Sequence, residues 1–228
     1  MLDIVIPTLN EGKQVRNLVE NLLRLPGVGD LVVVDASDDA SDIEVIGPVG
    51  ADPRLTLLAA SQKGRAQQMN QGAMICRHSA LLFLHCDTSL PNDVASLVSN
   101  VLVTRKWGRF DIRLDAAGFR FRLIEIMINL RSRVTRIATG DQAIFMHRDF
   151  FNEQGGFSDI ELMEDIEFSR RVGKYWTPGL VKTPVLTSAR RWINHGTVRT
   201  IFLMWTLRLL YRLGVSPAKL ATMYRDPR

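Results

Sequence analysis

The sequence Leu-Leu-Phe-Leu-His-Cys-Asp-Thr, residues 81–88, is an apolar run that ends in polar residues, with Pro91 shortly after it. Such a run is typical of a strand buried on both faces of a parallel sheet. We expect its carboxyl end to carry the chemistry. Alternation along a strand would place His85 and Asp87 on one face, where an imidazole and a carboxylate could meet one cation. Taken alone this metal signal is weak, and a strand that ends in a polar loop explains it slightly better.

The residues before this run alternate between predicted strands and helices. Buried strands are predicted at residues 2–7, 31–34 and 55–59, and helices at 13–25 and 65–76, with Asn10 as the cap of the first helix. Strand, helix and strand in turn, with short connections, indicate an α/β fold. The expected architecture is a Rossmann-like, doubly wound, mostly parallel sheet with helices on both faces. Ligands bind beyond the carboxyl ends of the strands in such sheets.

Length and composition favour a single domain in a reducing compartment. A chain of 228 residues with 46% hydrophobic content can bury a sizeable core. The amino terminus lacks the basic start and long apolar region of a signal peptide, which predicts a cytoplasmic protein. Cys76 and Cys86 are expected to be buried thiols, since two cysteines do not make a disulfide framework. The net charge of +5 comes mostly from arginine and favours diphosphates, acidic headgroups or nucleic acid.

Three predicted strand ends carry polar side chains. The first is followed by Thr8 and Glu11, the second by Asp35, and the third by Lys63 and Arg65. Acidic and hydroxyl groups can accept from a base edge and a ribose, and cations at a helix start can face a diphosphate. The set predicts a nucleotide pocket, although each residue alone is more often a cap or turn residue. The glycine spacings of Rossmann and Walker phosphate loops do not occur, which disfavours dinucleotide dehydrogenases and P-loop enzymes.

Several short motifs, in this order, resemble family 2 glycosyltransferases. They are Ile-Pro-Thr-Leu-Asn-Glu (6–11), Val-Val-Asp (33–35), Lys-Gly-Arg (63–65), Met-Asn-Gln-Gly-Ala (69–73), Gly-Gly-Phe (155–157) and Met-Glu-Asp-Ile-Glu-Phe (163–168). Each motif is weak alone, but their order and spacing along one chain are specific. The likeness covers nearly the whole chain. It is closest to a subgroup of small soluble members with His-x-Asp-Thr and Arg-Arg-Trp, sometimes linked to arsenosugar biosynthesis.

This resemblance implies a GT-A fold and an inverting transfer of a sugar from a nucleoside-diphosphate sugar to an acceptor hydroxyl. It implies three parts: a nucleotide-binding half at 1–88, an acceptor and catalytic half at 89–195, and carboxy-terminal amphipathic helices at 196–228. The nucleoside would be held by Pro7, Thr8, Glu11 and Asp35. Arg65 would contact the base or the phosphates, with Lys63 beside it.

The resemblance also implies a divalent cofactor and a general base. Asp87 matches the second aspartate of the family's metal motif, and His85 stands in place of the first. The cofactor is expected to be Mn²⁺ or Mg²⁺, with the imidazole favouring manganese. Asp165 matches the carboxylate that takes the proton of the acceptor hydroxyl. Glu164 would orient the loop or a nearby arginine, although carboxylates that open a helix are also favoured by its dipole.

The segment around Arg191 bears on processivity. Arg190-Arg191-Trp192 keeps the end of the Gln-x-x-Arg-Trp signature of processive members, but Ser188 replaces the glutamine. No transmembrane segment is evident, so we expect a non-processive enzyme. Arg191 or His195 is expected to close over the diphosphate, although capping or solvation of the following helix explains the arginines about as well.

The rest of the second half is basic and amphipathic. Strands are predicted at residues 107–114, 143–146 and 181–186, and a basic helix at 119–137 whose arginines are more simply explained as solvated. The arginines of residues 196–213 argue against a membrane span. Packing onto the sheet is the default for this segment. A homodimer interface and peripheral contact with an acidic membrane are the alternatives.

Two other classes of protein stay open. A nucleotidyltransferase would also need acidic metal ligands and basic phosphate contacts, but its usual Gly-rich amino-terminal loop is missing. A non-catalytic basic module that binds nucleotide, RNA or membrane would need an aromatic-interleaved basic surface, which only the tail approaches. No nucleic-acid partner is therefore expected. A nucleoside diphosphate bound to the purified protein, rather than a triphosphate or nothing, would separate the three classes.

Overall fold

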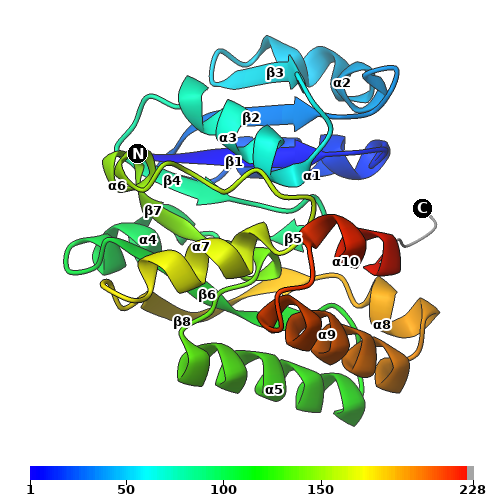
Figure 1. Ribbon diagram of the computed structural model, residues 1–228. Helices are drawn as coiled ribbons and strands as arrows, with labels where there is room; N and C mark the ends of the chain where they lie inside the picture. Colours follow the sequence, from blue (N-terminus) through cyan, green and yellow to red (C-terminus); the bar gives the residue numbers. More distant parts are fainter. Residues whose placement is uncertain (225–228) are drawn as a thin grey trace.

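The first half of the chain builds the parallel part of a single sheet. The computed structural model describes residues 1–224, and Figure 1 shows the sheet with helices packed around it. Four strands lie in the order β3-β2-β1-β4, all parallel: β1 (Leu2–Thr8), β2 (Val28–Asp35), β3 (Leu55–Ala59) and β4 (Ala80–Phe83). Aliphatic residues on both faces of β1 and β2 are buried, as expected of strands covered by helices on both sides.

The second half extends the same sheet with mixed pairing. The order continues β7-β6-β8-β5, with β5 (Thr88–Ser89), β6 (Trp107–Leu114), β7 (Phe145–His147) and β8 (Gly179–Thr187). β7 is antiparallel to both β4 and β6, whereas β6 and β8 are parallel. The predicted α/β class with a mostly parallel, doubly wound sheet is confirmed.

Helices cover both faces of the sheet. One face packs against α1 (Lys13–Leu23), α4 (Val94–Leu102) and α5 (Phe119–Thr135), and the other against α3 (Arg65–Ile75), α6 (Arg148–Glu153) and α7 (Glu164–Val172). The shorter elements are α2 (Ser41–Ile46), the 3-10 turns η1 (Gly47–Ala51) and η2 (Gly140–Gln142), and α8 (Arg190–Asn194). Gly72 of α3 lies so close to β1 that an added Cβ would fall 2.4 Å from a Val5 methyl carbon, so this helix approaches the sheet without a side chain between them.

The strand predicted from residues 81–88 is shorter than expected. β4 ends at Phe83, and the Leu84 N–H still donates to the Val5 carbonyl at 2.9 Å. The chain then turns, closed by a bond from the Thr88 N–H to the His85 carbonyl at 3.1 Å. Strand alternation therefore does not reach Asp87, because a turn replaces the extended backbone on which it depends.

The predicted cap of the first helix is wrong. α1 begins at Lys13, and Asn10 adopts a left-handed φ of 56° with its N–H donated to Ser37 Oγ at 2.9 Å. The loop before the helix is held instead by Asp42, whose carboxylate accepts from the Glu11 and Gly12 N–H groups at 3.0 and 2.6 Å. The Asp42 carboxylate, about thirty residues away, thus stabilises the start of this helix in place of the Asn10 side chain.

The carboxy-terminal segment forms α9 (Thr197–Arg212) and α10 (Pro217–Tyr224). Within the described residues, the buried apolar side chains of these helices join neither of the two clusters that pack on the sheet, which corrects the expectation that the segment packs there. Leu207 and Leu220 form a small separate cluster with Met163 and Ile166, which flank the start of α7. Within the described residues, none of the helices combines the length and apolarity that a membrane crossing requires. Residues 225–228 of the predicted carboxy-terminal segment lie outside the described part of the chain.

Candidate active site

The carboxyl ends of β1 and β2 meet as the sequence predicted. Thr8 and Asp35 are opposite each other in the parallel register and both are buried, and Pro7 pairs with Val34 beside them. Among the described residues, the Thr8 hydroxyl is one of the few buried side-chain groups without a hydrogen-bond partner. Buried polar groups are normally paired, so this hydroxyl is a candidate contact for a ligand at the strand ends.

Asp35 is engaged by its own loop. Its Oδ1 accepts from the N–H and hydroxyl of Ser37 at 2.8 and 2.6 Å, and its Oδ2 accepts from the N–H groups of Asp42 and Ile43 at 3.1 and 3.3 Å. The carboxylate thereby fixes the loop between β2 and α2. Asp42, buried and bonded to the loop after β1, was not singled out from the sequence, because its partners lie about thirty residues away.

Lys63 and Arg65 point to different partners. Lys63 makes an exposed ion pair with Asp38 at the rim of the site. Arg65, at the start of α3, lies with Nη1 3.6 Å from Glu164 Oε1 at the start of α7. The predicted nucleotide half and the predicted catalytic pair therefore touch through Arg65.

A second link joins α3 to the loop that leads into α7. Asn70 of α3 accepts the Phe157 N–H at 2.9 Å and donates to the Phe157 carbonyl at 2.8 Å. An added Cβ on Gly156, which has a φ of +70°, would lie 2.7 Å from Asn70 Oδ1. These contacts join two motifs that are far apart in the sequence, Gly-Gly-Phe and Met-Asn-Gln-Gly-Ala. We call them the Asn70 clamp, which fixes the position of the loop before α7.

Glu164 and Asp165 open α7 after a strained residue. Met163 has a φ of +74°, which costs a side-chain-bearing residue on the order of 1 kcal/mol or more, and its packing with Ile166 beside α9 holds it there. Glu164 is 3% exposed. Asp165 Oδ2 accepts the Gly140 N–H at 2.8 Å, and its Oδ1 accepts the Ile166 N–H at 2.6 Å.

The two carboxyl groups share an electrostatic setting. Burial raises the pKa of Glu164, against the attraction of the Arg65 guanidinium. Burial likewise raises the pKa of Asp165, against the hydrogen bond from the Gly140 N–H. A carboxylate whose pKa is raised accepts a proton more readily, which is the property that a general base uses.

His85 lies against the same carboxylates. A small cavity of about 10 Å³, room for one water, is lined by His85, Gly140, Glu164 and Asp165 together with apolar residues of α3 and β4. An added Cβ on Gly140 would fall 2.4 Å from His85 Nε2, so this turn approaches the imidazole only because residue 140 is glycine. We call His85, Glu164 and Asp165 the Asp165 cluster.

Two arginines reach this centre from helices that the sequence did not connect to it. Arg131 of α5 and Arg208 of α9 both interact electrostatically with Asp141 and Asp165. Burial, together with repulsion from Arg208, lowers the pKa of Arg131 to about 10. Arg131 Nε is among the buried groups of the described chain that lack a hydrogen-bond partner. The prediction that the arginines of this helix are simply solvated therefore fails for Arg131.

The predicted metal ligands line different spaces. Asp87 is exposed on the turn after β4 and borders a hollow of about 730 Å³ between α1 and that turn, whereas His85 borders the cavity of the Asp165 cluster. The donors are chemically suited to Mn²⁺ or Mg²⁺, and both lie at the carboxyl end of β4. That they share one ion stays a prediction.

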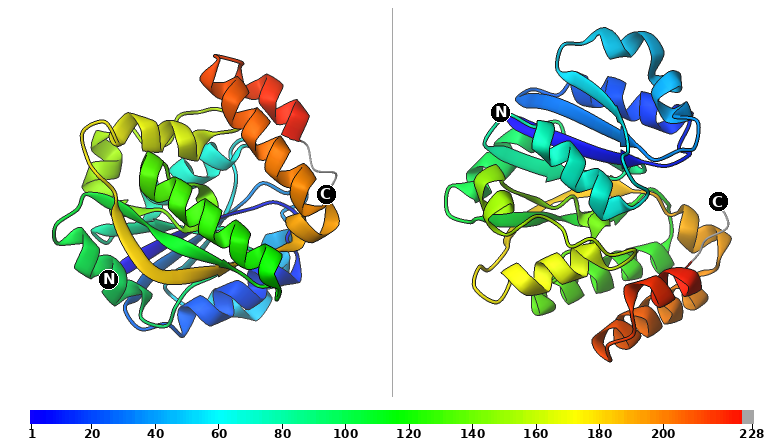
Figure 2. Two further views of the ribbon diagram at one scale, coloured as in Figure 1. Left: turned by 90° about the horizontal axis from the view of Figure 1, so that it is seen from below. Right: turned by 45° about the horizontal axis from the view of Figure 1, so that its top comes forward.

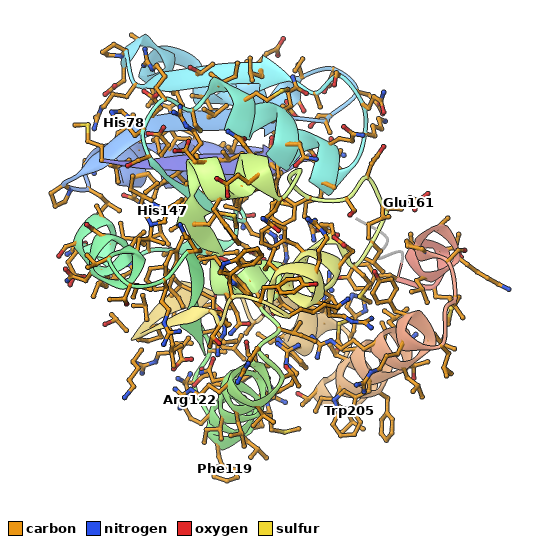
Figure 3. All side chains as sticks on the ribbon, turned by 60° about the vertical axis from the view of Figure 1, so that its left-hand side comes forward. His78, Phe119, Arg122, His147, Glu161 and Trp205 are labelled. Carbon is orange, nitrogen blue, oxygen red and sulfur yellow. The ribbon has the colours of Figure 1, made fainter. Side chains whose placement is uncertain are left out.

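A different trio in the described residues has metal-compatible donors within 4.8 Å of one another, namely Asp3, Asp30 and His78. We call it the Asp3 cluster. Asp3 already accepts from the N–H groups of Asp30, Arg77 and His78 at 2.8 Å each and contacts His78 Nδ1 at 2.7 Å. It lies at the amino ends of the strands, away from the Asp165 cluster, and Figure 3 shows His78 and Glu161 at opposite edges of the molecule. With the Arg77 cation on Asp30, we interpret it as an ion-pair cluster.

Arg191 is held by the carboxy-terminal helix. Its guanidinium lies 4.5 Å over the ring of Tyr224 and donates to the Tyr224 hydroxyl. The helix that contains it, α8, is short and has no buried residues. Closure of Arg191 over a diphosphate stays a prediction, and it would require this stacked arrangement to open.

Comparisons with known proteins agree with this geometry. Residues 3–106, somewhat less than half of the chain, match the model of the family described as Glycosyl transferase family 2. The matched segment carries Thr8, Asp35 and Arg65. The match agrees with the expected class of enzyme, a glycosyltransferase. No curated protein matches the chain.

Solved structures show the same fold. The S. aureus TarS 1–349 structure in complex with UDP has a TM-score of 0.65 and 14% identity, with 82% of this chain and 60% of that chain covered. The TarS 1–349 structure in complex with UDP-GlcNAc gives 0.64 and 13% over 82% and 58%. The chain thus has the GT-A fold and spans about 60% of the length of the TarS 1–349 chains.

Proposed function

We propose that the protein transfers a sugar from a nucleoside-diphosphate sugar to an acceptor hydroxyl, with inversion and without processivity. The observation that carries this proposal is the Asp165 cluster, which is joined through Arg65 to the strand ends of the Glycosyl transferase family 2 domain. UDP and UDP-GlcNAc, bound in structures of the same fold, support a nucleotide-sugar donor. The His-x-Asp-Thr and Arg-Arg-Trp motifs support the small subgroup linked to arsenosugar biosynthesis.

In the proposed reaction, Asp165 is the general base. The acceptor oxygen attacks the anomeric carbon, its proton passes to the Asp165 carboxylate, and the bond to the nucleoside diphosphate breaks with its electron pair on the diphosphate. Inversion follows because attack and departure occur on opposite sides of that carbon. The Gly140 and Ile166 N–H groups hold the carboxylate in one orientation, and Glu164 holds Arg65.

The donor would lie along the strand ends. Pro7, Thr8, Glu11 and Asp35 would contact the nucleoside, and Lys63, Arg65 and Arg191 the phosphates. A divalent ion held by Asp87 and His85 would offset charge on the leaving diphosphate. The roughly 10 Å³ cavity beside Asp165 is too small for a sugar, so the donor and acceptor must meet outside it or widen it.

A binding screen tests the proposal directly. The purified chain is titrated with UDP, GDP and dTDP, each with Mn²⁺ or Mg²⁺, by calorimetry and by thermal shift. We expect one nucleoside diphosphate to bind at micromolar affinity in a metal-dependent manner, and the matching sugar nucleotide to be consumed when an acceptor is supplied. Preference for a nucleoside triphosphate would favour a nucleotidyltransferase instead. If no nucleotide binds, the non-catalytic basic module is the remaining one of the three classes.

A further inference from the structure

The helices α5 and α9 each expose an apolar stripe along their length. On α5 the stripe is Phe119, Leu123, Ile126, Leu130 and Val134, and the stripe that begins on α9 is Val198, Phe202, Trp205, Leu209 and Leu213. Both follow the same spacing of four, three, four and four residues, which places each set on one side of its helix. Phe119 is 83% exposed and Trp205 is 56% exposed. Soluble domains rarely expose continuous apolar surface of this extent.

The two stripes lie on one side of the molecule. α5 and α9 run beside each other along the lower edge of Figure 1, and the view from below in Figure 2 presents both helices to the reader. Phe119 and Trp205 both project outward from the lower part of the molecule in Figure 3. Arg131 of α5 and Arg208 of α9 repel one another electrostatically, which fits helices that are neighbours. We call the exposed surface of these two helices the α5–α9 face.

The chain segments that form and adjoin this face carry an excess of positive charge. Residues 119–136 and 190–224, which span α5 and α8 to α10, contain eleven arginines and lysines and one acidic residue, the buried Glu125. The remaining residues hold 18 basic and 23 acidic side chains, so the rest of the chain is net negative. Arg120, Arg136, Arg199 and Arg212 are exposed around the stripes.

The apolar stripes and the positive charge together indicate which kind of partner binds this face. A second copy of the chain would bring two strongly cationic faces together with almost no acidic group to separate them, so charge disfavours a homodimer through this face. Nucleic acid would satisfy the arginines but would leave the aliphatic stripes in water. A bilayer surface with acidic headgroups satisfies both, since acyl chains cover the stripes and headgroups pair with the arginines.

We propose that the α5–α9 face rests on a membrane surface that is rich in acidic lipids. Both helices lie in the plane of the interface, with their apolar stripes at the boundary between headgroups and acyl chains. Within the described residues no helix is long and apolar enough to cross a membrane, which agrees with contact from one side. The proposal does not depend on the reaction assigned to the Asp165 cluster.

Vesicle binding of the full chain tests the proposal, with Trp205 as an internal probe. Vesicles of phosphatidylcholine alone are compared with vesicles that contain about one third phosphatidylglycerol. We expect at least roughly tenfold tighter binding to the acidic vesicles, weakened by salt. The fluorescence of Trp205 should shift to shorter wavelength on binding. Trp205→Phe should still bind but lose most of that shift, because Trp107 is buried and Trp176 and Trp192 are partly covered.

A matched pair of variants makes the test specific. Leu130→Glu with Phe202→Glu places charge in both stripes and should weaken acidic-vesicle binding tenfold or more. Val103→Glu with Met74→Glu changes the net charge equally at positions that are 79% and 78% exposed on other elements, and should bind like the wild type. Both proteins should melt near the wild-type temperature. Equal binding to neutral and acidic vesicles, or wild-type binding by the stripe variant, would overturn the proposal. A dimer that only the stripe variant loses would assign the face to a second copy and would also overturn it.

Discussion

Two clusters in this protein are built from the same chemical groups, two carboxylates and a histidine. The surroundings of these groups shift the pKa of carboxyl groups in opposite directions. In the Asp3 cluster, Asp3 accepts three main-chain N–H groups and Asp30 pairs with Arg77 at 2.7 Å. The hydrogen bond from Arg77 lowers the pKa of Asp30. In the Asp165 cluster, burial outweighs the available donors and raises the pKa of both carboxyl groups. The Asp3 cluster therefore stays charged and its ion pairs hold the amino ends of the strands together. The carboxyl groups of the Asp165 cluster bind a proton more readily.

The largest expected effect comes from removing the proposed base. Asp165→Asn keeps the shape of the side chain but removes its basicity, so turnover should fall about a hundredfold or more while affinity for the nucleoside diphosphate stays nearly unchanged. Steady-state kinetics and calorimetry on the same preparation measure the two quantities. If Asp165→Asn turns over normally and Glu164→Gln is inactive, the roles of the two residues are reversed.

The matching change in the other cluster should affect folding instead. Asp3→Ala leaves the N–H groups of Asp30, Arg77 and His78 without their acceptor, so the free energy of unfolding should fall by about 3 kcal/mol. Urea denaturation measures this loss. Turnover per folded molecule should match the wild type, and Asp3→Asn serves as the milder variant if Asp3→Ala does not fold. A large loss of turnover in the folded fraction would mean that the Asp3 cluster takes part in the reaction.

Metal dependence separates the two sets of candidate ligands. Asp87→Ala should weaken Mn²⁺-dependent binding of the nucleoside diphosphate roughly tenfold or more, and His85→Asp should keep it with an altered preference among metals. Asp30→Asn is the control and should bind the metal–nucleotide pair like the wild type. Calorimetry with and without EDTA decides between them. The assignment fails if Asp87→Ala binds as the wild type does and binding never depends on metal.

The smallest expected effect is on the pH dependence of folding stability. The direction of this dependence differs between the two clusters. Because the pKa of Glu164 is raised in the folded protein, its contribution to stability is full below the unfolded pKa and is lost as pH rises through the folded pKa. Glu164→Gln should therefore be at least as stable as the wild type at pH 7. The lowered pKa of Asp30 has the opposite effect, so Asp30→Asn should be less stable at pH 7, and the difference should shrink on acidification. Thermal unfolding from acidic to neutral pH measures both trends, and a destabilised Glu164→Gln at pH 7 would contradict the first.

Much of the framework was predictable because local signals decide it. The apolar runs of β1, β2 and β3 and the spacing in α1 and α3 each specify an element within a few residues, and β6 was predicted with the bounds that it has. Gathering Thr8, Asp35 and Arg65 at one edge follows from the parallel arrangement. The short β4, the loop bonds of Asp42 and the Asn70 clamp could not be predicted, because their partners lie about 30 to 90 residues away.

The sequence by itself determined the α/β class, the mostly parallel sheet and the candidate groups at its strand ends, because periodicity and polar residues at strand ends are local properties. Only the tertiary structure decided which groups meet. It joined Arg65 to Glu164 and Gly140 to Asp165, placed His85 against them, and left the stripes of α5 and α9 exposed on one side. The physical reason is that burial and the distances between distant segments set both the pKa of a carboxyl group and the exposure of an apolar side chain, and neither is fixed until the chain has packed.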